Sequence, residues 1–81
     1  MTLSDVLKAY GKNKAYIRQG HKLGVSGSQP VMTYSGWNDW TTEVPEKLWY
    51  REVRTINASP IEMYDRPSAV LEIILEGYEE L

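Results

Sequence analysis

The stretch AVLEIILEGYEEL, residues 69–81, decides the fold of this chain. Read as a strand, it places Leu71, Ile73 and Leu75 on one face and Glu72 and Glu76 on the other. Read as a helix, it also gathers its apolar residues on one side. Its β-branched residues favour the strand, as does Gly77, which would cost about 1 kcal/mol inside a helix. We therefore expect a strand here and keep the helix as the alternative.

Helix and strand signals alternate in the rest of the chain. Thr2 and Asp5 form a weak capping box before an apolar stripe, which predicts a short helix that Gly11 ends. Pro45 at a first helical position, followed by Glu46, predicts a second short helix over residues 45–50. Strands are predicted at residues 15–18, 31–34 and 52–57.

Turn chemistry separates these elements. Residues 20–29 contain three glycines and two serines and predict a flexible hairpin loop, and Pro30 is tolerated as the first residue of the next strand. Turns are also predicted at residues 35–40, 57–60 and 65–68. The whole predicts one α+β domain over residues 1–81, with a small, mainly antiparallel sheet of three to five strands and two short helices on one face.

This layout resembles that of small uncharacterised phage and prophage proteins. The resemblance rests on the segments TLSDVLKAY, KAYIR, VPEKL, REV and LEIIL, in that order along the chain. It covers most of the chain. It consists of the order and spacing of these segments and of the turn residues between them, and it contains no functional motif. It implies an α+β domain of a phage accessory protein, and it assigns no catalytic or binding residue.

Length and composition exclude several classes of protein. Eighty-one residues, of which 42% are hydrophobic and 25% charged, suit a single globular domain with a thin margin of stability. Cysteine is absent, so no disulfide framework or thiolate metal site is expected, and a cytoplasmic location fits best. With one histidine and no acidic loop of calcium-site spacing, we expect no metal and no cofactor. No apolar run reaches the roughly 18 residues that span a bilayer.

Charge is distributed unevenly along the chain. Residues 1–22 are basic and residues 61–81 are acidic, although the net charge is only −2. The two ends either pack together and neutralise each other, which we favour, or form separate basic and acidic faces that steer a charged partner.

Catalytic constellations are missing from the sequence. His21 lies between glycine and lysine in the predicted loop, with no partner to orient it. The carboxylate pairs Glu72 and Glu76, or Glu43 and Glu46, could in principle hydrolyse a glycoside, but a chain of this length seldom forms the required cleft. The glycines of the 20–29 loop lack the Gly-Lys-Ser/Thr triplet of a phosphate-binding loop. We therefore expect the protein not to be an enzyme.

A basic segment over residues 12–22 suggests one binding function. It interleaves cations with an aromatic ring, as single-stranded nucleic-acid binders do, and Tyr16 and Arg18 share a face of the predicted strand with Lys14 beside them. Lys22 closes the segment. The sequence pI of about 5.3 opposes this function, which is therefore the alternative.

Five aromatic residues within residues 34–50 suggest the other binding function. Because the chain has no phenylalanine, Trp49 is expected to belong to the core. Trp37 and Trp40 lie in a polar turn, where each buried indole N–H would need an acceptor, so at least one is expected to be exposed. With Tyr34 they form the predicted partner-binding site.

The main hypothesis is accordingly a non-catalytic module that occupies a surface of another protein, whose identity the sequence does not reveal. If the phage resemblance holds, that partner is a host protein or another phage protein. A small open sheet also has edges available for pairing, so a homodimer through strand pairing is a further expectation.

Overall fold

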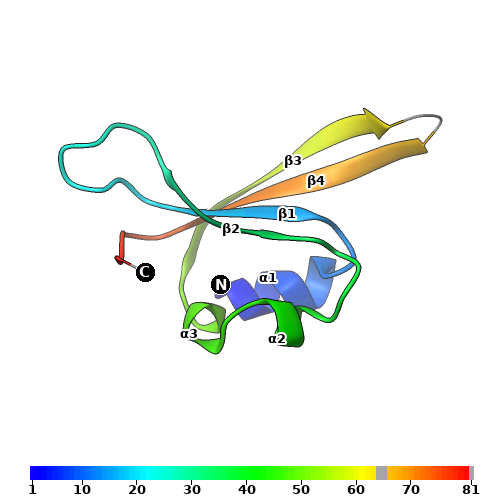
Figure 1. Cartoon of the computed structure of the whole chain (residues 1–81), viewed down its shortest axis with the longest axis horizontal. Coiled ribbons are helices and arrows are strands. Elements are labelled where there is room, and N and C mark those ends of the chain that lie inside the picture. Colours follow the sequence, from blue (N-terminus) through cyan, green and yellow to red (C-terminus); the bar gives the residue numbers. More distant parts are fainter. Residues whose placement is uncertain (64–65, 81) are drawn as a thin grey trace.

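The computed structural model of the chain describes residues 1–63 and 66–80. It contains a four-stranded mixed sheet in the order β2-β1-β4-β3, with all the helices on one face of the sheet (Figure 1). Neighbouring strands are antiparallel except for the central pair, β1 and β4, which are parallel. The elements are α1 (Leu3–Tyr10), β1 (Ala15–Gln19), β2 (Gln29–Tyr34), α2 (Trp40–Glu43), α3 (Glu46–Trp49), β3 (Val53–Met63) and β4 (Arg66–Leu75). The predicted α+β class and the strand number are confirmed.

The first helix forms where the sequence predicts it. The amide of Asp5 donates to the Thr2 hydroxyl at 3.4 Å and the amide of Thr2 donates to the Asp5 carboxylate at 3.0 Å, which completes the capping box. Leu3, Val6 and Leu7 are fully buried under the sheet. Tyr10, which the helical spacing places on the same stripe, is 49% exposed because it lies on the last turn, beyond the edge of the core.

The last stretch of sequence is a strand as far as Leu75, and the helical alternative is wrong. β4 lies between β1 and β3, so its backbone is paired on both sides over Leu71–Leu75. Leu71, Ile73 and Leu75 face the helices and are almost fully buried, as the alternation predicts. Two-sided pairing and this apolar face outweigh the helical spacing.

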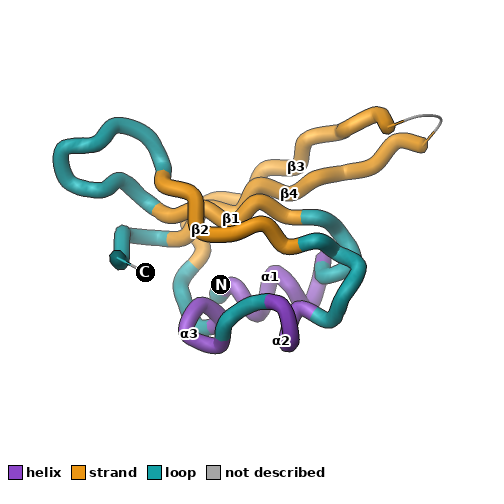
Figure 2. The backbone as a smooth tube through the Cα atoms, in the orientation of Figure 1, coloured by secondary structure: helices purple, strands orange, loops and turns teal. Residues whose placement is uncertain are grey.

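Two predicted turns are wrong. The segment 57–60 continues β3, which pairs in register with β4 as far as Met63. In the segment 65–68, Arg66–Ser68 belong to β4, and Asp65 lies outside the described residues. The distal half of this hairpin extends beyond β1 as a two-stranded ribbon (Figure 2).

Proline positions on β4 and β3 explain why these turn signals failed. The Leu71 amide donates to the Lys14 carbonyl at 2.9 Å, so odd-numbered residues of β4 direct their backbone groups away from β3. Pro67 follows the same alternation, so its backbone nitrogen, which carries no hydrogen, faces an outer edge. Pro60 pairs with Ala69, whose backbone also faces away from β3, so Pro60 lies on the opposite outer edge. Strands tolerate proline at such positions.

The edge strand β2 also carries a proline whose nitrogen faces outward. Pro30, the second residue of β2, pairs with Arg18, whose backbone groups face β4. Pro30 therefore also directs its nitrogen outward. Proline on an edge interrupts the row of donors that another strand would need, so these positions weigh against a homodimer formed by regular strand pairing.

The described residues form three helices where two were predicted. The additional one, α2, begins after Asp39, whose carboxylate accepts a hydrogen bond from the Thr41 amide at 2.9 Å. In α3, Pro45 is the residue that precedes the helix and not its first helical position. Both helices cover the sheet beside α1 (Figure 1). The core between the two layers consists of Leu3, Val6, Leu7, Ala15, Ile17, Tyr34, Val44, Leu48, Leu71, Ile73 and Leu75.

The acidic C-terminal segment packs beside the end of β1, which confirms the expected contact between the two ends, but only Lys22 of the N-terminal cations lies near a C-terminal carboxylate. The Gln19 side chain is 3% exposed, donates to the Glu79 carbonyl at 2.8 Å and accepts from the Glu79 amide at 3.0 Å. Lys22 approaches Glu80 at 3.7 Å. Within residues 1–63 and 66–80, no helix is long and apolar enough to cross a membrane.

Candidate functional site

The turn between β2 and α2, residues 35–39, is held tightly against the chain that follows α1. Gly36 has a φ of +79°, and a Cβ there would lie 2.8 Å from backbone atoms of Asn13 and Lys14. The amide and the hydroxyl of Ser35 donate to the two carboxylate oxygens of Glu43 at 2.8 and 2.7 Å. The turn therefore has a fixed position and conformation.

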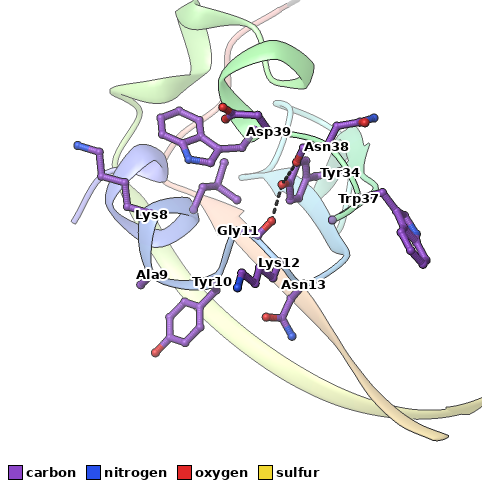
Figure 3. A pocket seen from close by; sticks show the side chains of 13 residues that line it. Lys8, Ala9, Tyr10, Gly11, Lys12, Asn13, Tyr34, Trp37, Asn38 and Asp39 are labelled. Atoms are coloured by element: carbon purple, nitrogen blue, oxygen red, sulfur yellow. Dashed lines mark hydrogen bonds between the residues drawn. The ribbon is translucent and has the colours of Figure 1, made fainter.

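Tyr34 lies beneath this turn and is part of the core. Its side chain is 0% exposed, so the prediction that it contacts a partner is wrong. Its hydroxyl faces the carbonyl oxygens of Gly11 and Asn38, the latter at 2.6 Å, and ties the end of α1 to the turn (Figure 3). Burial, together with the charges of Glu43 and Asp39, raises the pKa of Tyr34, so the hydroxyl keeps its proton and remains a donor.

The two tryptophans of the turn segment have different environments. Trp37 is 93% exposed, whereas Trp40 is half-buried and packs against the core. Trp40 meets Trp49 edge to face, with ring centroids 5.1 Å apart, and the Trp49 indole N–H donates to the Val44 carbonyl at 2.8 Å. The two tryptophans of the predicted site therefore have different roles. Trp37 is available to a partner, whereas Trp40 packs against Trp49 and the core.

A groove of about 500 Å³ lies between the end of α1 and this turn. Figure 3 shows the Tyr10 ring on one side of the groove and the Trp37 indole extending outward on the other. Tyr10 is half exposed, and Lys8 and Lys12 are exposed beside it. The full lining comprises Leu7, Lys8, Ala9, Tyr10, Gly11, Lys12, Asn13, Tyr34, Gly36, Trp37, Asn38, Asp39 and Trp40.

The charges around the groove differ in how they are used. Hydrogen bonds from Thr41 lower the pKa of Asp39, and those from Ser35 lower the pKa of Glu43, so both carboxylates are ionised. Lys8 and Lys12 form no ion pair with any described residue. The groove therefore presents two cations and two aromatic rings to a ligand, with the ionised carboxylate of Asp39 on its turn side.

The basic segment of the alternative hypothesis lies on the other face of the sheet. Ala15, Ile17 and Gln19 of β1 are buried, so Tyr16 and Arg18 share the open face as predicted. The Lys14 ammonium lies 5.4 Å from the centroid of the Tyr16 ring.

Arg18 and Lys22 at the end of that segment already have contacts within the chain. Arg18 donates through Nε to the Ser28 hydroxyl at 2.7 Å and through Nη2 to the Ser28 carbonyl at 2.8 Å. Lys22 lies in the loop near Glu80. The structure thus brings Lys14, Tyr16 and Arg18 together and leaves Lys22 outside the group.

The weaker catalytic candidates do not converge. Glu43 is bound to Ser35, Glu46 is exposed on α3, and His21 is exposed in the β1–β2 loop. Glu72 is half-buried on the open face of the sheet and Glu76 is exposed beyond β4. In the described part of the chain, no group of three or more His, Cys, Asp or Glu residues could hold a metal ion.

Several groove residues were missed in the sequence, namely Lys8, Tyr10 and Lys12. They belong to the predicted first helix and its end, and only the packing of the 35–39 turn against residues 12–14 brings them next to Trp37. The available signal was that Gly11 ends the predicted helix directly after Tyr10. We compared the chain with protein families, with curated proteins and with solved structures, and no match was found in any of the three comparisons.

Proposed function

We propose that this protein is a non-catalytic protein-binding module that uses the groove between α1 and the 35–39 turn. The observation that carries the proposal is the 93% exposure of Trp37 on a turn whose backbone is held in place. Tryptophan is among the residues most enriched at binding hot spots, and an anchor that is already positioned loses little entropy on binding.

The chemistry of the groove supports one kind of partner. Trp37 and Tyr10 supply apolar contact area, and Lys8 and Lys12 attract negative charge. We therefore propose that the partner contributes an apolar side chain flanked by Asp or Glu. The resemblance to phage accessory proteins supports a host protein or another phage protein in this role, and the absence of cysteine supports a cytoplasmic location.

A random-peptide display library tests the proposal without a known partner. The library is selected on the wild-type protein and depleted on Trp37→Ala, and retained peptides are measured by calorimetry. We expect peptides that combine apolar and acidic residues and that lose about 2 kcal/mol or more of binding free energy with Trp37→Ala. Tyr50→Ala is the matched control because Tyr50 is a 71% exposed aromatic residue that does not line the groove. If no peptide distinguishes Trp37→Ala from Tyr50→Ala, the proposed groove function is wrong.

A further inference from the structure

A second hollow lies on the open face of the sheet, where the β1–β2 loop meets β3 and β4. It has a volume of about 320 Å³, and its lining is Gly20, His21, Ser28, Arg54, Thr55 and Ile74. Arg54 and His21 are exposed, and no carboxylate is among the described residues that line the hollow. The hollow thus presents positive charge and hydrogen-bond donors to a ligand.

Arg18 adds a cation whose position is fixed. Its guanidinium is held by the two hydrogen bonds to Ser28, a residue of the hollow's own lining. The Nη1 group has no hydrogen-bond partner among the described residues. A guanidinium that is already oriented loses less side-chain entropy when it binds an anion, and its planar donors match the oxygens of a phosphate.

Next to these cations, the same face carries an aromatic ring. Tyr16 precedes Arg18 by two residues, about 6.7 Å along the strand, and is 39% exposed. Lys14 lies over this ring at 5.4 Å. Cations that follow a backbone, with an aromatic platform between them, are the arrangement by which proteins bind single-stranded nucleic acid.

We propose that the open face of the sheet binds single-stranded nucleic acid. A phosphate of the strand occupies the hollow beside Arg54 and His21, Arg18 reaches the edge of the hollow where it is bonded to Ser28, and a neighbouring base stacks on Tyr16 beside Lys14. The proposal does not depend on the groove, because the groove is lined by α1 and the 35–39 turn, whereas this surface consists of side chains that face away from the helices.

Glu72 provides an internal check on this proposal. It pairs in register with Tyr16 and lies half-buried on the same face, so its carboxylate repels a phosphate backbone next to the stacked base. Replacing Glu72 with the isosteric glutamine removes that repulsion. The variant Glu72→Gln should therefore bind nucleic acid more tightly than the wild type, by about two- to five-fold at low salt.

The test is fluorescence anisotropy with a labelled oligothymidylate about twelve nucleotides long. Binding should weaken with salt along a logarithmic slope of about −2, since the three cations Arg54, Arg18 and Lys14 face the strand's backbone and each phosphate contact contributes about 0.7. We expect Arg54→Gln and Tyr16→Ala each to weaken binding at least about five-fold. Lys47→Gln is the control, because it removes one positive charge from an exposed position on α3.

Circular dichroism of each variant establishes that the fold is retained. Absence of binding by the folded wild type at low salt overturns the proposal. An equal loss of affinity with Lys47→Gln and Arg54→Gln also overturns it. Tighter binding of a duplex of the same length, without any effect of Tyr16→Ala, overturns it as well. Either result indicates general attraction of a polyanion. Weaker binding by Glu72→Gln also contradicts the proposed arrangement.

Discussion

Replacing Trp37 with alanine should hardly change the stability of the protein, whereas replacing Trp40 should lower it markedly. Trp37 is 93% exposed, so its loss should change the free energy of unfolding by no more than about 0.5 kcal/mol. Trp40 is half-buried and contacts Trp49 edge to face. A fully buried tryptophan costs about 3–5 kcal/mol when truncated, so half burial together with the lost ring contact should cost about 2–3 kcal/mol.

Urea denaturation followed by far-ultraviolet circular dichroism measures both values without relying on tryptophan fluorescence. For a domain of this size, the Trp40→Ala loss corresponds to a melting temperature lower by about 10–20 °C, whereas Trp37→Ala should melt within a few degrees of the wild type. A loss above about 1 kcal/mol for Trp37→Ala would refute the assignment of Trp37 as a surface residue. A loss below that value for Trp40→Ala would refute its assignment to the core.

Three further predictions follow from the turn and the sheet edges. Gly36→Ala should destabilise the fold by more than about 1–2 kcal/mol in a urea titration, because alanine disfavours a φ of +79° and its Cβ would press on the chain after α1. Unchanged stability would contradict the tight packing. Because the pKa of Glu43 is lowered in the fold, its hydrogen bonds to Ser35 should stabilise the protein above the ordinary pKa of 4.5 and stop doing so as the pH falls through the lower folded value. Glu43→Gln should therefore flatten the acid side of a curve of stability against pH. A profile identical to that of the wild type would exclude this contribution. Replacing Pro30, Pro60 and Pro67 together with threonine should increase self-association in sedimentation velocity, because it restores outward donors at three edge positions of the sheet. A wild type that is already dimeric would contradict the protective role of these prolines.

How far the fold could be predicted differs from element to element. The capping box at Thr2 and the β-branched residues of the last strand are local signals, and both predicted the correct element. Pro60 misled because proline is common in turns, and only the register with β4 shows that it lies on an outer edge. The four-residue helix α2 was missed because a single turn has too few residues for a periodicity to be recognised.

The candidate sites were less predictable because they depend on contacts between distant segments. The polar turn around Trp37 indicated an exposed indole, but Tyr34 at the end of β2 was assigned to the surface without knowledge of which face it occupies. Arg54 is far from Ser28 in the sequence, and only the sheet order brings both to one hollow. Sequence patterns report local geometry, whereas these sites require the topology.

The parallel pairing of β1 with β4 has a consequence for how the chain folds. Ala15 pairs with Leu71, and these residues are 56 positions apart, whereas both hairpins join neighbouring strands. Closing so long a loop costs entropy before the contacts it enables can repay it. The two hairpins should therefore form first, and their docking along the central pair should limit the rate. Ile73→Val, at the middle of that pair, should then slow refolding in a denaturant-jump experiment.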